Sequence, residues 1–263
     1  MGVTVTNAGI TPLVLTFNEA PNIDRTLARL QWAERVVVVD SFSTDETLAI
    51  CRRYPNVDLK QRRFDNHTDQ WNWGLDQIAT EWVLSLDADY VLTEALIDEL
   101  SAWRPTDDRD GYYARFTYCV FGKRLRGSLY PPRVVLFRRA ACRYVPDGHT
   151  QRLRVSREPG WLNGRIEHDD RKPVDRWVAD QLRYAALEAH HLTTTPRAEL
   201  SKPDLIRRKA VLAPGLVFFY TLFGQRLILD AWPGCYYVLQ RTCAELMISL
   251  RLVEARLRAR TSN

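Results

Sequence analysis

The sequence has no apolar run long enough to cross a bilayer and no closely spaced pair of cysteines. The run Val211–Phe223 covers about a dozen residues, whereas a membrane-spanning helix needs about 20. The five cysteines are widely spaced, and none forms the Cys-x-x-Cys pair of a zinc site or a redox dithiol. Met1 to Ile10 contain no Lys or Arg and lead into no long apolar stretch, which argues against a cleaved signal peptide. These absences favour a protein of the reducing cytosol.

A basic excess is missing from residues 1–200, although the whole chain has a net charge of +5 and a pI near 9.0. These residues carry 27 Lys/Arg and 28 Asp/Glu, whereas residues 201–263 carry ten Lys/Arg and four Asp/Glu. In this tail the basic residues are interleaved with apolar runs, which suits an anionic lipid surface better than a nucleic acid. Packing on the rest of the chain or on a second subunit explains the tail equally well, so both interpretations stay open.

The first hundred residues alternate short apolar runs with helical patterns. Such a pattern predicts buried strands joined by right-handed helical crossovers, and hence an α/β fold with a mainly parallel sheet. The predicted strands are Pro12–Thr16, Arg35–Asp40 and Trp82–Asp87, and the predicted helices are Asn22–Leu30, Thr44–Arg53 and Asp69–Ala79. The composition, 46% hydrophobic and 26% charged, is that of a globular protein.

The second half of the chain changes pattern. From Gly111 the side chains alternate between two faces, and a further strand is predicted at Val134–Arg138, which indicates a mixed or antiparallel extension of the sheet. Gly160–His168 is interpreted as a hairpin or loop that closes over the functional site, which is expected at the strand ends described below. Val174–Ala189 has the pattern of a helix.

After Pro196 the sequence predicts a helical pair, made by the run Val211–Phe223 and the segment Cys235–Arg260 and broken at Pro233-Gly234. We therefore expect a first domain at residues 1–195, whose two halves, at about 8–105 and about 106–195, differ in their strand pattern. Residues 196–263 form a helical appendage.

Polar side chains lie at the carboxyl ends of the predicted strands. Glu19 follows the first strand, Asp40 ends the second, and Asp87 and Asp89 end the third. Parallel sheets bind ligands at this edge, so these side chains are expected to converge there. Two carboxylates spaced Asp-x-Asp suit Mg²⁺ or Mn²⁺, with diphosphate oxygens completing the coordination. Caps and turns are the plain alternative, and they explain Asp40 and the Asp pair less well.

Three ordered motifs resemble those of the family 2 glycosyltransferases of GT-A fold. They are Thr16-Phe17-Asn18-Glu19 with Asn22-Ile23, then Val36 to Thr47, and then Ser85-Leu86-Asp87-Ala88-Asp89. The resemblance covers residues 10 to about 100 and is strongest to the branch that acts on lipopolysaccharide core and other bacterial surface glycans. It implies a Rossmann-like nucleotide-binding sheet and a nucleoside-diphosphate sugar as the donor substrate. The first domain would then be catalytic, with its donor half at about 8–105 and its acceptor half at about 106–195.

The resemblance also implies roles for individual residues. Glu19 and Asp40 would contact the nucleoside, Asp87 would lie beside the ribose and the metal, and Asp89 would ligate the metal directly. This assigns the donor and its cation to the ends of neighbouring strands.

For four further polar residues, a structural interpretation competes with a functional one. Gln70 and Asn72 stand where the family places polar residues near the donor, and a solvated helix face explains them almost as well. Arg133 lies in a segment that looks like the acceptor side of the family, where it would meet an acidic or phosphorylated acceptor, although solvated surface is the default. His168 ends an apparent strand and either faces the site or belongs to a charged loop.

Inverting transfer needs a base that takes the proton of the acceptor hydroxyl. The family commonly has a His-Glu pair in this region, but here Thr150 follows His149. Asp147 is therefore the first candidate for the base, and His149 is the second candidate or a metal ligand. A plain turn at Asp147-Gly148 is the alternative.

The leading hypothesis is a metal-dependent inverting glycosyltransferase of bacterial cell-envelope glycan synthesis. It would move a sugar from a nucleoside-diphosphate sugar to a saccharide or lipid-linked acceptor. A polyprenyl-phosphate acceptor, which needs no base, and a non-catalytic nucleotide-sugar-binding scaffold are the alternatives. We expect a cytoplasmic protein with peripheral contact at the inner face of the cytoplasmic membrane through its C-terminal helices, and no nucleic-acid partner.

Overall fold

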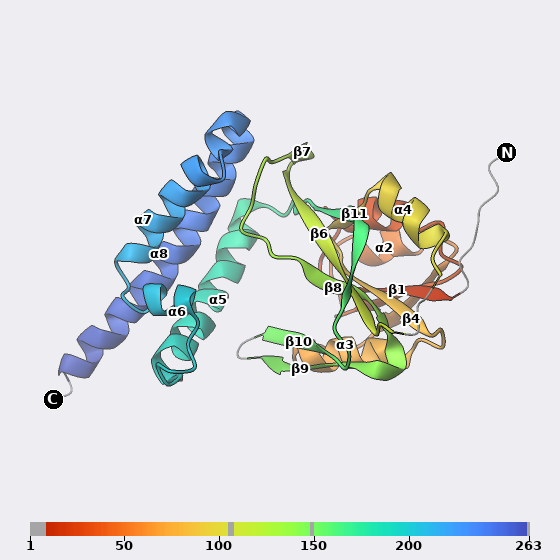
Figure 1. The fold of residues 1–263 in the computed structure, drawn as a ribbon, viewed down its shortest axis with the longest axis horizontal. Helices are drawn as coiled ribbons and strands as arrows, with labels where there is room; N and C mark the ends of the chain where they lie inside the picture. Colours follow the sequence, from red (N-terminus) through yellow and green to blue (C-terminus); the bar gives the residue numbers. More distant parts are fainter. Residues whose placement is uncertain (1–8, 105–107, 148–149, 262–263) are drawn as a thin grey trace. The chain divides into compact units, whose positions relative to one another are not determined.

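The chain divides into two compact units in the computed structural model, which describes residues 9–104, 108–147 and 150–261 (Figure 1). The α/β unit comprises residues up to 122 together with 130–171, and the helical unit comprises residues 123–129 and 172–263. The division therefore lies at residues 171–172, earlier in the chain than the predicted boundary at residue 195. The reason is that helix α5 (Val174–Thr194) buries Ala189 and Leu192 in a cluster with residues of the later helices.

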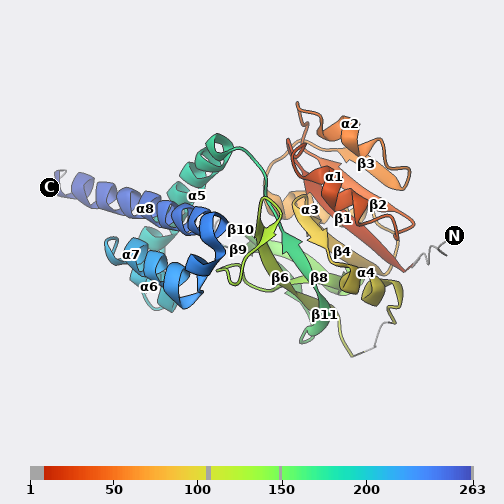
Figure 2. The same cartoon turned by 90° about the horizontal axis from the view of Figure 1, so that it is seen from above.

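The first half of the α/β unit is a parallel sheet, as predicted. Its strands are β1 (Ile10–Thr16), β2 (Val36–Asp40), β3 (Val57–Gln61) and β4 (Trp82–Asp87). They lie in the order β3-β2-β1-β4 (Figure 2). Leu15 of β1 pairs with Val39 on one side and with Asp87 on the other. The three predicted strands are confirmed within two residues. Strand β3 was not predicted, because its side chains are only half-buried at the sheet edge and give no apolar run.

The second half extends the same sheet with mixed directions, which confirms the predicted extension. Beyond β4 the order continues with β8 (Arg133–Arg138), β6 (Gly111–Val120), β11 (Gly160–His168) and β5 (Tyr90–Leu92). Strand β8 is antiparallel to β4 and β6, and β11 is parallel to β6. The interpretation of Gly160–His168 as a hairpin or loop over the site is wrong. It is an inner strand of the sheet, and its Leu162 and Ile166 are fully buried.

Helices cover both faces of the sheet (Figure 1). One face carries α1 (Ile23–Ala28), α2 (Thr47–Cys51) and α4 (Glu94–Ser101), and the other carries α3 (His67–Asp76) and the hairpin of β9 (Cys142–Asp147) and β10 (Thr150–Val155). Val36 and Val38 of β2 point into the first core, and Val37 and Val39 point into the second. This alternation explains why a continuous valine run forms a strand buried on both faces.

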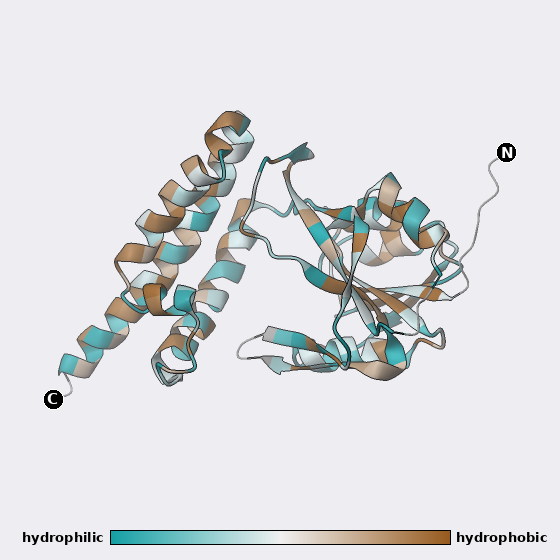
Figure 3. Ribbon diagram, in the orientation of Figure 1, coloured by the Kyte–Doolittle hydropathy of each residue, from teal (hydrophilic) through white to brown (hydrophobic). Residues whose placement is uncertain are grey.

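The helical unit contains α5, α6 (Lys202–Arg207), α7 (Leu212–Phe219) and α8 (Ala231–Thr261). The predicted helical pair is present, but its break does not lie at Pro233-Gly234. It lies earlier, where Arg226 and Ala231 adopt left-handed backbone with φ of 58° and 50°. Pro233 instead stands in the first turn of α8, where a helix needs no N–H donor. Figure 3 shows the strongly hydrophobic colouring of α7.

Candidate active site

The candidate site lies at the carboxyl edge of the parallel strands, between β1 and β4. The chain leaves β1 toward β2 on one side and later places β4 on the other side, so the strand order reverses here. Such a reversal leaves a crevice in which open α/β sheets bind ligands. Asp40 ends β2, Asp87 ends β4 and Glu19 follows β1, so three of the predicted site residues lie along this edge.

Hydrogen bonds hold the loops after β1 and β2 together. Asn18, with φ of 53°, accepts from the Thr44 N–H through Oδ1 at 2.7 Å, and its own N–H donates to Ser43 Oγ at 2.7 Å. Asparagine is among the few residues that tolerate this left-handed backbone. The half-buried carboxylate of Glu19 accepts from Asn22 Nδ2 at 3.0 Å. Glu19 is therefore fixed beside the end of β1, where the nucleoside contact was predicted.

Asp40 is fully buried, and its carboxylate organises the turn after β2. Oδ1 accepts from Thr16 Oγ1 at 3.0 Å, and Oδ2 accepts from the Ser43 N–H at 2.8 Å and from Gln61 Nε2 at 3.4 Å. A buried carboxylate needs such donors to offset its lost hydration. The structure thus gives Asp40 a role in shaping the donor-side turn, and its contact with a nucleobase stays a prediction.

The two amides predicted on the donor side lie in different surroundings on α3. Gln70 is buried, accepts from Arg62 at 2.6 Å and donates to Ser41 Oγ at 3.1 Å, so it lies beside the turn after β2. Asn72 donates to the Tyr144 carbonyl at 2.9 Å and accepts from the Tyr144 N–H at 3.0 Å. Both ends of this amide therefore join α3 to β9, and we do not place Asn72 in the donor site.

Asp87 and Asp89 occupy distinct environments at the end of β4. Asp87 lines an open cavity of about 520 Å³, whereas Asp89 is 7% exposed and its Oδ2 lies 3.1 Å from His168 Nε2. Burial disfavours the charged imidazolium of His168. The charge and hydrogen bond of Asp89 and the charge of Asp87 outweigh that effect, so the pKa of His168 is raised above its ordinary value. His168 thus faces the site and holds Asp89 in place.

The two carboxylates fit a divalent cation that is shared with a diphosphate. In the described part of the chain, no group of three or more His, Cys, Asp or Glu side chains can hold a metal alone. Mg²⁺ is commonly held by one or two carboxylates, with substrate phosphates and water supplying the other oxygens. Asp87 at the cavity wall and Asp89, two residues further along the chain, supply the carboxylates of this set of hard ligands. His149, the third predicted ligand, lies outside the described residues.

The predicted base lies on the β9–β10 hairpin. The backbone of Asp147 ends β9 and pairs with Thr150 of β10. The hairpin packs on the same face of the sheet as α3, and its Tyr144 donates a hydrogen bond to Ser85 of β4 at 3.0 Å. Only the backbone of Asp147 is described, so its role as the base stays a prediction, as does that of His149.

Two features of the site were missed or underweighted from the sequence. His168 contacts Asp89 although 79 residues separate the two, and the sequence offered only its place at the end of a strand. Arg152 and Arg154 of β10 line the cavity together with Asp87 and Arg133. The signal for these two arginines was their alternation in the segment Thr150–Val155, which has the period of a strand.

Comparisons with known proteins identify the family of the chain. The model of the family described as "Glycosyl transferase family 2" matches residues 13–153, more than half of the chain. The lipopolysaccharide core biosynthesis glycosyltransferase LpsC of Rhizobium meliloti is 24% identical over 204 residues, which cover 68% of this chain and 70% of that protein. An uncharacterized glycosyltransferase of Rickettsia felis is 29% identical over 106 residues, or 40% of this chain. The match spans 37% of the length of this Rickettsia relative.

A solved structure supports the same fold. Residues 1–349 of TarS from S. aureus, in complex with UDP-GlcNAc, match with a TM-score of 0.50 and 14% identity, covering 90% of each chain. At this identity the likeness concerns the fold, and it confirms the expected α/β architecture of GT-A type. All three strand-end motifs fall within the range that the family model matches, and the chain belongs to glycosyl transferase family 2.

Proposed function

We propose that this protein is an inverting, metal-dependent glycosyltransferase that moves a sugar from a nucleoside-diphosphate sugar to a saccharide or lipid-linked acceptor of the bacterial cell envelope. The observation that carries the proposal is the pair Asp87 and Asp89 at the end of β4, beside the reversal of strand order. The names of LpsC, a lipopolysaccharide core glycosyltransferase, and of TarS, which was solved with UDP-GlcNAc, support the envelope glycan and the nucleotide sugar.

The chemistry divides among named residues. Glu19 and the turn shaped by Asp40 would hold the nucleoside, and Asp87 and Asp89 would hold Mg²⁺ or Mn²⁺. When bound, the cation offsets the charge of the leaving diphosphate. The acceptor oxygen bonds to the anomeric carbon while the bond from that carbon to the diphosphate oxygen breaks. The nucleoside diphosphate leaves with the electron pair, and Asp147 takes the proton of the acceptor hydroxyl.

The release of nucleoside diphosphate tests this proposal. Purified protein with Mn²⁺ and a panel of nucleotide sugars is expected to release nucleoside diphosphate, and Asp89→Ala is expected to lower that rate by about a hundredfold or more. Asp98→Ala, an exposed carboxylate on α4, is the matched control and should keep the wild-type rate. If Asp89→Ala, folded by circular dichroism, also keeps it, the metal assignment is wrong. Tight nucleotide binding by the wild type with no turnover on any acceptor would favour the non-catalytic scaffold.

A double variant, Asp147→Asn with His149→Ala, tests the base. With a sugar hydroxyl as acceptor, loss of both groups should reduce turnover by roughly 10²–10⁴-fold, since no side chain remains to take the proton. A polyprenyl-phosphate acceptor is already anionic and needs no base. Near wild-type turnover of the double variant would therefore support that alternative.

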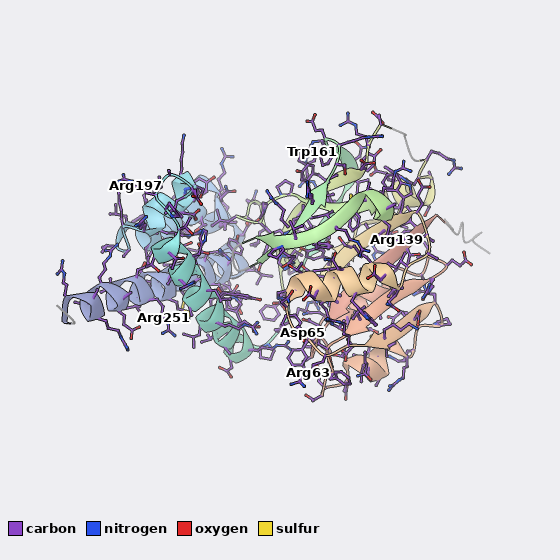
Figure 4. All side chains as sticks on the ribbon, turned by 90° about the horizontal axis from the view of Figure 1, so that it is seen from below. Arg63, Asp65, Arg139, Trp161, Arg197 and Arg251 are labelled. Atoms are coloured by element: carbon purple, nitrogen blue, oxygen red, sulfur yellow. The ribbon has the colours of Figure 1, made fainter. Side chains whose placement is uncertain are left out.

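The helical unit supports the peripheral membrane contact that we also propose. Within the described chain no single helix is long and apolar enough to cross a membrane. The pair Leu212–Gly224 and Leu227–Arg260, which is bent by 68°, reaches the length and apolar composition of a span only when both helices are taken together. Large aromatic side chains next to the bend are exposed, with Trp232 85%, Phe219 61% and Phe223 55% accessible. Aromatic rings favour the membrane interface, and basic residues of α8, such as Arg251 labelled in Figure 4, favour anionic lipid.

Vesicle flotation tests this contact. The protein is expected to float with vesicles of phosphatidylcholine and phosphatidylglycerol, and less with phosphatidylcholine alone. The triple variant Phe219→Ser, Phe223→Ser and Trp232→Ser should stay with the soluble fraction, whereas Leu187→Ser on α5, also an exposed apolar residue, should float as the wild type does. A wild-type protein that does not float and that elutes as a dimer, with the triple variant monomeric, would assign the surface to a second copy instead.

A further inference from the structure

The cavity beside Asp87 extends away from the donor loops into the half of the sheet that was predicted to hold the acceptor. Its volume is about 520 Å³, and it lies in the α/β unit between strands of the sheet and the β9–β10 hairpin. Ser85 and Asp87 of β4 and Tyr113 of β6 line it on the sheet, while Tyr144 and Leu153 line it on the hairpin. A ligand in this cavity would therefore touch the same carboxylate that we assign to the cation of the donor.

Three arginines line this cavity, and they outnumber its acids. Arg133 belongs to β8, and Arg152 and Arg154 belong to β10, whereas Asp87 is the one acid among the described lining residues. Within residues 9–104, 108–147 and 150–261, none of the three guanidinium groups forms an ion pair or donates a hydrogen bond. Arg143 on the same hairpin differs, because it lies 2.6 Å from Asp76.

This cluster suits an anion better than a neutral sugar alone. Three guanidinium groups on one cavity create a positive potential that an anionic ligand relieves, and their planar forks match phosphate and carboxylate oxygens. Arg133 is also steadied by the ring of Tyr130, whose centroid lies 5.3 Å from the guanidinium carbon. The rings of Trp71 and Tyr144, stacked at 5.2 Å, add apolar surface to the same wall.

We infer that the cavity is the acceptor pocket and that it binds an acceptor carrying a phosphate or carboxylate group through Arg133, Arg152 and Arg154. The donor diphosphate does not need these arginines, because Asp87 and Asp89 supply it with a cation. This inference rests on the proposed glycosyl transfer and adds to it the charge of the acceptor. The anionic group belongs either to a sugar of the acceptor or to the phosphate of a lipid carrier.

Calorimetric titration of the full chain tests the inference with small probes. The anionic probes are glucose 6-phosphate, glucuronate and geranyl phosphate, the neutral probe is glucose, and the donor-side probes are UDP and GDP with Mg²⁺. The variant is Arg152→Gln with Arg154→Gln, two exposed side chains whose replacement leaves the core intact. Arg143→Gln is the matched control on the same hairpin. The wild type should bind at least one anionic probe roughly tenfold more tightly than glucose.

The double variant should lose about tenfold of that affinity, while its affinity for UDP or GDP and both affinities of Arg143→Gln should stay within about twofold of wild type. Binding of a sugar phosphate or glucuronate identifies an acidic saccharide, and binding of geranyl phosphate alone identifies a lipid carrier. Equal affinity for glucose and all anions would overturn the inference. A parallel loss of nucleotide affinity in the double variant would overturn it too, because it would assign the arginines to the donor. A wild type that binds neither UDP nor GDP would contradict the proposed function itself.

Discussion

The two units of the chain place their large apolar side chains in opposite ways. In the α/β unit they fill two buried clusters on the faces of the sheet, whereas 19 of the 24 large apolar side chains that are exposed in the described chain belong to the helical unit. Proteins that act alone in solution rarely expose large contiguous apolar patches. The α/β unit therefore leaves few large apolar side chains on its surface. The helical unit exposes many, which is typical of a surface that contacts another molecule.

The difference begins in the sequence. Val36–Val39 can be apolar throughout because helices cover both faces of the sheet at β2. Helix α7, Leu212–Phe219, is also apolar around its whole circumference, but only Ala213 and Pro214 of it are buried. A helix of that composition is normally enclosed by protein or lipid. The comparison holds only if the helical unit keeps its own fold.

The largest effect is expected at Glu245, the buried acid of the helical unit. It is 2% exposed and lies 2.7 Å from Arg207, which also approaches Glu188 at 3.4 Å. Glu245→Ala leaves a mostly buried guanidinium without its main partner, so the free energy of unfolding should fall by about 3 kcal/mol. Urea denaturation followed by circular dichroism measures this.

Glu254→Ala is the matched control on the same helix. Its carboxylate is exposed and lies 2.8 Å from Arg258, so its loss should change the free energy of unfolding by less than about 1 kcal/mol. If Glu245→Ala and Glu254→Ala lower stability equally, the helical unit has no interior of its own. The contrast between the two units would then fail.

The next effect is expected at Gly164 of β11, in the interior of the α/β unit. A Cβ placed there would lie 2.4 Å from Leu96 Cα and 2.7 Å from Leu96 N, and the backbone of α4 cannot yield as a flexible side chain would. Gly164→Ala should therefore lower the free energy of unfolding by roughly 1–3 kcal/mol, the usual range for overpacking. A variant as stable as the wild type in urea would show that α4 does not press on β11.

Gly164 also explains why β11 was interpreted as a hairpin or loop and not as an inner strand of the sheet. Its inward positions are Leu162, Gly164 and Ile166, so a glycine interrupts the apolar alternation that marks a half-buried strand. The glycine is required by the close approach of α4, which no local pattern reveals. By contrast β1, β2 and β4 were predictable, since each carries its own apolar run.

The site was predictable to the same degree as its strands. Glu19, Asp40, Asp87 and Asp89 follow elements that the sequence specifies locally, and the parallel order brings those ends to one edge. The arginines of the cavity converge only because a hairpin folds back over the sheet. Such long-range packing depends on the whole fold, so residue types and spacing alone did not show it.

A smaller effect concerns the pH dependence of stability at His168. Its pKa is raised in the folded protein by Asp89 and Asp87, against the opposing effect of burial. The stabilisation is therefore fully present below the unfolded pKa of about 6.5 and is lost as the pH rises through the higher folded value. His168→Gln removes this contribution. The difference in free energy of unfolding between wild type and variant should shrink as the pH rises above the unfolded pKa of about 6.5. A constant or growing difference would contradict the raised pKa.

The smallest effect should have the opposite sign to that at Gly164, and it lies in the helical unit. Gly215 is an exposed residue within α7, and a Cβ built there meets no heavy atom within 4 Å. Alanine restricts the unfolded chain and favours the helix, so Gly215→Ala should raise the free energy of unfolding by about 0.5–1 kcal/mol. Replacement of glycine by alanine would thus destabilise the α/β unit at Gly164 and stabilise the helical unit at Gly215. A loss of stability in urea, without vesicles, would mean that another part of the protein already covers α7, and its exposed apolar side chains would no longer indicate a membrane.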